Sequence, residues 1–254
     1  MPSDRDTVEL FHLHFVRLLA TGPGKANYVV KGGCNLRFFF GSMRYSQDLD
    51  LDVRGIPLHA LKERVDGVLD SRALREALAT AGIEVERTSS PKQTATTQRW
   101  KVGLRPAGRD VSLPTKIEFS RRDGEGAAAL EAVDPRLIRR HRTMPILACH
   151  YLLPAAIRQK IGALVGRRQV QARDVFDLSL LFARAGEDVA GYTDLLPKVP
   201  EAVERVWAVS YADYRGQVAA YLEPEHTDAL DSVVGWETMQ LHVVSALESL
   251  GRRA

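Results

Sequence analysis

The chain has 254 residues, of which 45% are hydrophobic and 26% are charged, and its formal net charge is +3. This composition is ordinary for a globular protein with one large or two modest domains. No apolar run reaches the roughly 18 residues of a membrane span, and the N-terminus lacks the basic-then-apolar order of a signal peptide. The two cysteines, Cys34 and Cys149, are too few for a four-ligand zinc site. We therefore expect a cytoplasmic protein.

The first half of the chain alternates between helical and extended patterns. The predicted elements are a helix over 6–19, a strand over 28–30, a short helix over 34–40, a strand over 48–53, a helix over 57–81, and strands over 98–104 and 111–119. The segment Arg-Pro-Ala-Gly-Arg between the last two strands is typical of a hairpin turn. This half therefore predicts a small mixed sheet with flanking helices.

Beyond Pro135 the periodic segments are helical. The predicted helices cover 148–166, 172–184, 200–208, 211–221 and 233–250. The fold class is thus α+β, with a small mixed-sheet core over 1–135 followed by an all-helical C-terminal half over 136–254. We expect the helical half to complete a cleft with the core.

The most informative stretch is Lys31-Gly32-Gly33, followed after fourteen residues by Asp48-Leu49-Asp50. Two aspartates at positions i and i+2 of a strand project from the same face. Carboxylates so close repel unless a cation lies between them, and Mg²⁺ prefers such oxygen ligands. A Gly-Gly pair at the start of a helix exposes backbone N–H groups that bind phosphate. Together these features predict a site for a nucleoside triphosphate (NTP) and its metal ions.

The alternative for Asp48, Asp50 and Asp52 is the solvated face of an amphipathic strand, although aspartate is depleted in strands. A two-metal site usually needs a third carboxylate. Glu118, on the predicted strand over 111–119, is the best candidate, and its alternative is a surface strand residue.

These residues resemble a known family. The first motif of the AbiEii/AbiGii (MenT-like) toxins is similar to two neighbouring segments of this chain, Lys31-Gly32-Gly33-Cys34-Asn35-Leu36-Arg37 and Gly41-Ser42-Met43-Arg44-Tyr45-Ser46-Gln47-Asp48-Leu49-Asp50. The second motif of the family is similar to the segments Lys160-Ile161-Gly162-Ala163-Leu164 and Arg173-Asp174-Val175-Phe176-Asp177-Leu178. Cys34 stands where the family often has threonine, which removes a hydroxyl near the phosphates.

The family lies in the DNA-polymerase-β-like nucleotidyltransferase superfamily. The resemblance implies a toxin of a type IV-like toxin–antitoxin system that moves a nucleoside monophosphate (NMP) from an NTP to RNA and so blocks translation. It further implies the tRNA 3′ end as acceptor, CTP or GTP as the expected NTP, and a separate antitoxin protein as partner.

On this interpretation Asp48, Asp50 and Glu118 hold two Mg²⁺ ions, which activate the acceptor hydroxyl and bridge the triphosphate. The expected nucleotide- and phosphate-binding residues are Lys31, Gly32, Gly33, Ser42, Arg44 and Ser46. Arginine suits bidentate phosphate binding.

Lys160 lies beside the apolar stripe of its predicted helix. It is either a residue at the rim of the core or, as the resemblance favours, a catalytic cation for the triphosphate. Asp174 and Asp177 share one helix face. We expect Asp174 to act directly, by orienting Lys160 or by accepting the acceptor proton, and Asp177 to be structural.

Two basic clusters contain the candidate RNA-binding residues Arg139, Arg140, Arg167 and Arg168. Their alternative is a solvated helix face. Two other functions stay open: an enzyme that modifies a small molecule such as an antibiotic, and a catalytically idle module that binds an NTP or an antitoxin.

Overall fold

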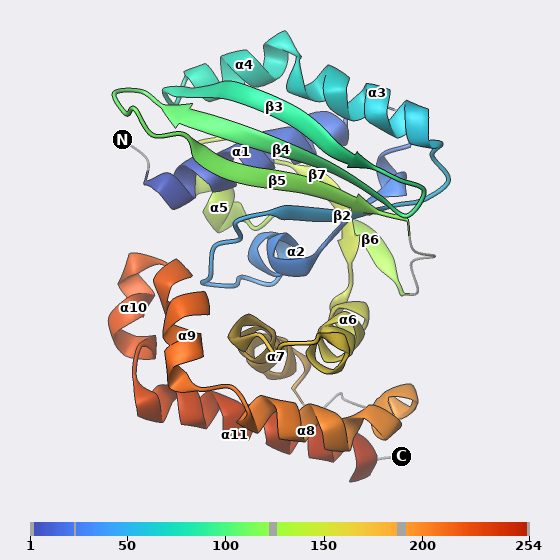
Figure 1. Cartoon of the computed structure of the whole chain (residues 1–254), viewed down its shortest axis with the longest axis vertical. Coiled ribbons are helices and arrows are strands. Elements are labelled where there is room, and N and C mark those ends of the chain that lie inside the picture. The colour runs from blue at the N-terminus through green and yellow to red at the C-terminus, as the bar shows by residue number, and fades with distance from the viewer. Residues whose placement is uncertain (1–2, 23, 122–125, 187–191, 253–254) are drawn as a thin grey trace. The chain divides into compact units, whose positions relative to one another are not determined.

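The computed structural model describes residues 3–22, 24–121, 126–186 and 192–252 (Figure 1). The chain divides into two units. The first contains Met1–Gly41 and Tyr45–Tyr151, and the second contains Ser42–Arg44 and Leu152–Ala254. The main division thus falls after Tyr151 rather than after residue 135, and three residues of the first motif belong to the helical unit.

The first unit is built on a seven-stranded mixed sheet with the order β3-β4-β5-β2-β1-β7-β6. The strands are β1 (Tyr28–Lys31), β2 (Leu49–Val53), β3 (Ile83–Gln93), β4 (Thr97–Pro106), β5 (Leu113–Ser120), β6 (Ala128–Ala132) and β7 (Leu147–Tyr151). β2 is parallel to β5 and β1 is parallel to β7, whereas the other neighbours are antiparallel. The α+β class predicted from the sequence is confirmed.

The end of the first unit differs from the sequence prediction. The helix predicted over 148–166 is wrong at its start, because β7 occupies Leu147–Tyr151 and α6 (Leu153–Gly166) begins only afterwards. Residues 148–151 are all buried. A strand that is buried on both faces has no alternation of apolar and polar residues, and a short apolar run of this kind resembles the start of a buried helix.

One face of the sheet is covered by helices. α1 (Asp4–Leu19) contacts β4, β5 and β7, α4 (Arg72–Ala79) contacts β3, and α3 (Leu58–Leu69) contacts α1. In Figure 1, α1 passes behind β4 and β5. The single helix predicted over 57–81 is two helices, because Ser71 caps a new helix by accepting a hydrogen bond from the backbone N–H of Leu74.

Alternation along β4 and β5 separates a buried face from an open face. On β4 the side chains of Trp100, Val102 and Leu104 are buried in the core. Lys101 and Arg105 of the same strand are exposed. We call the side of β3, β4 and β5 that carries Lys101 the open face.

The second unit is helical. Its elements are α6, α7 (Ala172–Ala185), α8 (Val199–Trp207), α9 (Tyr211–Gln217), α10 (Pro224–Leu230) and α11 (Val233–Arg252), with short 3₁₀ turns over Thr193–Lys198 and Ala219–Tyr221. α7 packs against α6 and α11, and Trp236 stacks on Tyr214 with ring centroids 4.7 Å apart. None of the helices in the described part of the chain has the length and apolar run needed to cross a bilayer.

The segment Ser42–Arg44 joins this unit through backbone contacts. Arg44 forms an isolated antiparallel bridge with Leu222, and the N–H of Glu223 donates to the carbonyl of Met43 at 2.9 Å.

A buried histidine supports the loop before β2. His12 Nε2 lies 2.8 Å from Thr115 Oγ1, and the Thr115 hydroxyl donates to the carbonyl of Gln47 at 2.7 Å. Because that hydroxyl proton is already used, His12 Nε2 must donate, which fixes the neutral tautomer with the proton on Nε2. Burial lowers the pKa of His12 to about 4, although the carboxylates of Asp48 and Glu9 oppose the shift.

The depressed pKa of His12 makes stability depend on pH. Above pH 6.5 the imidazole is neutral in both the folded and unfolded states. Between pH 6.5 and about 4 only the unfolded chain takes up the proton, so stability falls with pH by up to about 3 kcal/mol. We expect the stability of His12→Gln to fall less than that of the wild type as the pH is lowered through this window. Thermal unfolding at a series of pH values measures the difference. Parallel pH profiles for the two proteins would contradict the assignment.

Candidate active site

The turn between β1 and α2 (Gly32–Phe39) places a helix N-terminus beside an aspartate. Gly32 has φ +64°, a conformation that side chains other than glycine rarely adopt. A Cβ atom at Gly32 would lie 3.1 Å from Oδ2 of Asp50. Lys31, the N-cap residue, directs its ammonium to Asp52 Oδ1 at 2.5 Å instead of capping the helix. The first N–H groups of α2 therefore lie next to the Asp50 carboxylate.

The strand register brings the predicted carboxylates onto one face. Asp50 of β2 is the Cα partner of Lys31 on β1 and of Glu118 on β5. Directly paired residues of neighbouring strands point to the same side of a sheet. Asp48 lies two residues before Asp50, just outside β2, so Asp48, Asp50 and Glu118 lie near one another on the same face of the sheet.

Cations surround these carboxylates. Lys116 Nζ lies 2.9 Å from Asp48 Oδ2, and Arg99 Nε lies 2.6 Å from Glu118 Oε2. Burial raises the pKa of Asp50, and the neighbouring Asp48 and Glu118 add to the shift, whereas Lys116 and Lys31 oppose it. Burial therefore disfavours the ionised form of Asp50 even with two lysines nearby.

Two side chains of the first motif, Ser46 and Cys34, hold the backbone of Asp48. The Ser46 hydroxyl donates to the carbonyl of Asp48 at 2.9 Å, and the Cys34 thiol donates to the same oxygen at 3.3 Å. Burial raises the pKa of Cys34, so its sulfur stays a thiol. In this structure both side chains fix the position of Asp48.

The second unit contains five of the predicted residues: Ser42, Arg44, Lys160 and the two aspartates of the second motif, Asp174 and Asp177. Lys160 Nζ lies 2.5 Å from Asp177 Oδ2 and 3.2 Å from Asp174 Oδ1. Arg44 pairs with Asp177 at 3.3 Å, and the Ser42 hydroxyl accepts the Arg44 N–H at 3.3 Å. The structure thus brings these five predicted residues together.

Both aspartates of this cluster are fully buried, whereas the Lys160 side chain is 12% exposed. Burial alone would raise the pKa of Asp177, but Lys160 and Arg44 hold it below its usual value. Asp174 also pairs with Arg167 Nε at 2.8 Å. With no exposed surface, Asp174 is suited to orienting Lys160 rather than to accepting a proton from a bound substrate.

The four arginines predicted to bind RNA differ in their surroundings. Arg140 in α5 (Pro135–Arg140) pairs with Asp6 and donates to the hydroxyl of Tyr45, and Arg167 pairs with Asp174. Arg139 and Arg168 are exposed.

Among the described residues, two groups of three side chains offer metal-ligand atoms within 4.8 Å of one another: Asp6, Glu9 and His141, and Glu223, Glu225 and His226. Asp48, Asp50 and Glu118 are not among these groups, and two of the three carboxylates are paired with Lys116 and Arg99 instead.

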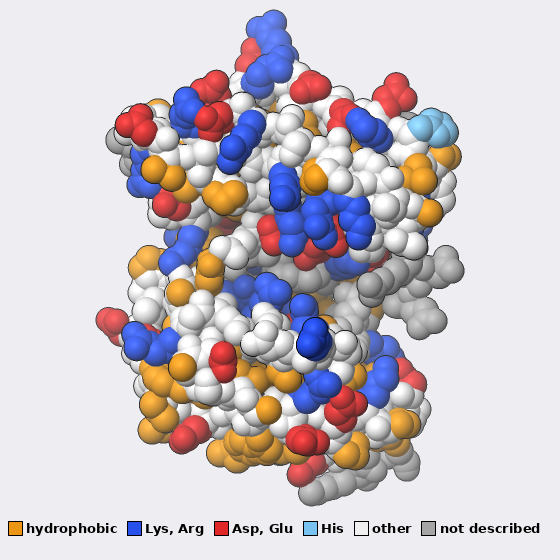
Figure 2. Space-filling model, in the orientation of Figure 1, with side chains coloured by type: hydrophobic (Ala, Val, Ile, Leu, Met, Phe, Trp, Pro, Cys, Tyr) orange, Lys and Arg blue, Asp and Glu red, His pale blue; other side chains and the backbone are white. Residues whose placement is uncertain are grey.

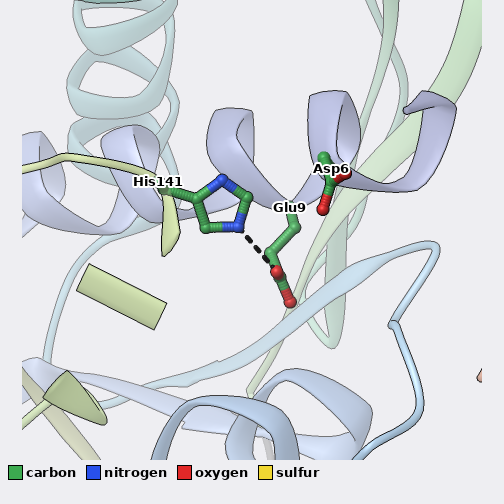
Figure 3. Close-up of side chains that lie close together, drawn as sticks. All are labelled: Asp6, Glu9 and His141. Atoms are coloured by element: carbon green, nitrogen blue, oxygen red, sulfur yellow. Dashed lines mark hydrogen bonds and ion pairs between the residues drawn. The ribbon is translucent and has the colours of Figure 1, made fainter. Parts of the chain in front are cut away.

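The first of these groups is an ion-pair network. Figure 3 shows the His141 imidazole turned toward Glu9, with Asp6 beside it on the same helix. His141 Nε2 lies 2.7 Å from Glu9, which also pairs with Arg37 of α2. Burial would raise the pKa of Glu9, but His141 and Arg37 lower it overall. Because protein cations already hold Glu9, the group connects α1 to α2 and to the end of α5.

Sequence reasoning missed Lys116, Arg99 and His12. The first two lie on the same face of their strands as Glu118, and the segment Lys116-Ile117-Glu118 alternates in the period of a strand. This alternation is the feature of the sequence from which a lysine beside the predicted carboxylates could have been expected. His12 gave no signal, because its contacts with Cys34 and Thr115 cross the fold.

The fold is that of known nucleotidyltransferases. A Helicobacter pylori protein, JHP933, is 19% identical, with a TM-score of 0.66, over 100% of this chain and 94% of that protein. MenT4, the nucleotidyltransferase toxin Rv2826c of Mycobacterium tuberculosis, is 20% identical, with a TM-score of 0.65, over 98% of this chain and 84% of the toxin. At this level of identity the likeness concerns the fold. A search of curated proteins gave no match.

The sequence profile described as nucleotidyl transferase AbiEii toxin, type IV toxin–antitoxin system, matches residues 15–249. The match covers most of both units, so the chain belongs to this family of nucleotidyltransferase toxins. The family assignment made from the two motifs is confirmed.

The second-unit cluster predicts a large stability effect. Lys160→Met leaves two buried carboxylates without a shared cation, and removing one partner of a buried ion pair costs about 3 kcal/mol. We expect a clearly lower melting temperature, which Asp177→Asn in the same chain partly restores because it removes one of the charges. The matched control is Lys198→Met, since Lys198 is exposed. Equal melting temperatures for Lys160→Met and Lys198→Met would contradict this role.

Proposed function

We propose that this chain transfers an NMP from an NTP to the 3′ end of an RNA, with tRNA as the expected acceptor, and that it thereby blocks translation in the cytoplasm. The observation that carries the proposal is the contact of the Asp50 carboxylate with the first residue of α2, on the face of the sheet that also carries Asp48 and Glu118. Asp50 lies against Gly32, and Glu118 is its register partner. The family assignment supports transferase chemistry at these residues.

The arrangement suits a triphosphate. A helix N-terminus binds phosphate through backbone N–H groups and the helix dipole, and the glycines at 32 and 33 leave the first turn of α2 unobstructed by side chains. Lys31 adds positive charge at the same end of β1, in contact with Asp52.

The donor set also fits divalent metal ions, and we propose Mg²⁺. Three carboxylates provide hard oxygen ligands, and a cation beside Asp50 would favour the ionised form that burial disfavours. Asp48, Asp50 and Glu118 would hold the ions, after Asp48 and Glu118 turn from Lys116 and Arg99. When bound, such ions stabilise the attacking and leaving oxygens of a phosphoryl transfer.

In the proposed step the acceptor 3′-hydroxyl oxygen forms a bond to the α-phosphorus, and the bond from that phosphorus to the bridging oxygen of the β-phosphate breaks. Pyrophosphate leaves, and the hydroxyl proton passes to solvent or to a carboxylate of the site. Ser46 and Cys34 keep Asp48 in place during this exchange through its carbonyl.

We propose a charge-neutralising role toward the triphosphate for Lys160. Asp174 and Asp177 would hold its ammonium in place, while Arg44 and Arg167 balance the remaining charge of these aspartates. Ser42 would fix the backbone of Arg44. Arg44 and Ser42 would then contribute to phosphate binding indirectly, by supporting the aspartates that hold Lys160.

Membership of a type IV toxin–antitoxin family implies an antitoxin partner and a nucleotide substrate. We propose CTP or GTP as the nucleotide, and a separate antitoxin protein that neutralises the toxin. Modification of a small molecule is the competing function. Incubation with each labelled NTP, Mg²⁺ and either total tRNA or an aminoglycoside separates the two.

The carboxylates give the first functional prediction. Asp48→Asn and Asp50→Asn should each reduce transfer of labelled NMP to background. The raised pKa of Asp50 means that its ionised form costs stability at neutral pH, so Asp50→Asn should melt at the same temperature as the wild type or higher. Asp70→Asn, at an exposed residue, is the control and should stay active. Near-wild-type transfer by either site variant would overturn the metal assignment.

The exposed arginines give the second functional prediction. Reversal of Arg167 would disturb the buried Asp174, so the sharper test reverses only Arg139 and Arg168, which are exposed. If they contact RNA phosphates, Arg139→Glu/Arg168→Glu should weaken tRNA binding and reduce the salt slope of its affinity by roughly one to two. NTP affinity should not change. An unaltered salt slope would mark both as solvated surface residues.

A further inference from the structure

A groove lies on the open face of the sheet, next to Asp48. It is a cavity of about 610 Å³, which is in the size range of sites for small ligands. Its lining comes from β3, β4, β5 and the loop before β2, and includes Asp48, Arg87, Ser89, Lys101, Gly103 and Lys116. All of these residues belong to the first unit.

The groove is positively charged along its length. Lys101 is the register partner of Lys116 on β5 and of Ser89 on β3, so these three side chains form a row across the open face. Arg87 and Lys101 are exposed. In Figure 2, Lys and Arg side chains gather over β3, β4 and β5, with acidic side chains among them.

Gly103 gives the groove its floor. It is the register partner of Arg87 and of Pro114. A Cβ atom at this position would lie 2.9 Å from Cγ of Arg87 and 2.7 Å from Oγ of Ser112. The Arg87 side chain therefore lies across the bare backbone of β4, inside the groove, and the shape of the groove depends on a glycine.

The strand order assigns the two substrates to opposite sides of the carboxylates. β2, with Asp50, lies between β1 and β5. The N-terminus of α2 follows β1, on one side of Asp50, whereas Glu118 and the groove lie on the β5, β4 and β3 side. A transfer between two polyanions needs positive charge on both sides of the metal-binding carboxylates. The helix N-terminus serves the triphosphate, and the groove is the matching site for the other polyanion.

We propose that this groove holds the terminal nucleotides of the single-stranded acceptor RNA, with Arg87 and Lys101 on its phosphodiester groups; this rests on the transfer to RNA proposed above. The hydroxyl of Ser89, on the same face as Lys101, is available to the ribose and phosphate oxygens. Asp48 at the rim places the 3′-hydroxyl of the bound strand next to the proposed metal ligands.

The test uses Arg87→Gln/Lys101→Gln in the full chain. The control is Lys25→Gln/Arg72→Gln, which removes one lysine and one arginine that are also exposed but lie outside the groove. Binding of a 5′-labelled single-stranded RNA is measured by fluorescence anisotropy over a salt series, and KM for RNA and affinity for the NTP are measured in parallel.

We expect the groove variant to raise Kd and KM for RNA about tenfold and to lower the salt slope by about 1.4, or about 0.7 for each lost phosphate contact. NTP affinity and the control variant should match the wild type. Wild-type RNA binding by the groove variant would overturn the inference while leaving the proposed function intact. A parallel loss of NTP affinity would also overturn it, because the groove would then hold the triphosphate. If the wild type modified no RNA at all, the proposed function would fail, and RNA binding would still decide whether the groove holds a strand.

Discussion

The close approach of Gly32 to Asp50 is the constraint on which the site depends. Only a residue without a Cβ leaves room for the Asp50 carboxylate beside a backbone of positive φ. This contact fixes the start of α2, and with it the direction of the helix N-terminus. The same register places Glu118 next to Asp50. One turn thus places the start of α2 beside the Asp50 carboxylate and its register partner Glu118.

Negative charge is handled differently in the two units. Around Asp50 the carboxylates are partly buried, and burial raises the pKa of Asp50, with Asp48 and Glu118 adding to the shift. Around Asp177 they are fully buried and balanced by Lys160 and Arg44, and its pKa is lowered. A further cation would favour the ionised form of Asp50, whereas Asp177 is already held in that form by two protein cations. The contrast supports a chemical role for Asp50 and a positioning role for Asp177.

Much of this was accessible from the sequence. The alternation around Asp48 and Asp50, the glycines after β1 and the two motifs led to the family and the α+β class, and Glu118 was located on the correct strand. β3 was missed because it is a largely exposed edge strand with polar residues on both sides, and β7 because it is buried on both faces. The alternation of Lys116-Ile117-Glu118 shows that Lys116 shares a face with Glu118, but the pairing of Arg99 with Glu118 is set by strand register, which local periodicity does not encode.

The chain path through Ser42–Arg44 has an evolutionary consequence. These three residues are contributed by the middle of the first motif, yet they are structurally part of the helical unit, where Arg44 pairs with Asp177 and bridges to Leu222. A single crossover after Tyr151 between two related genes would therefore join one parent's Arg44 to the other parent's Asp177. The two units cannot be exchanged as independent cassettes, and residues 42–44 are expected to covary with the helical unit across the family rather than with the strands that flank them in sequence.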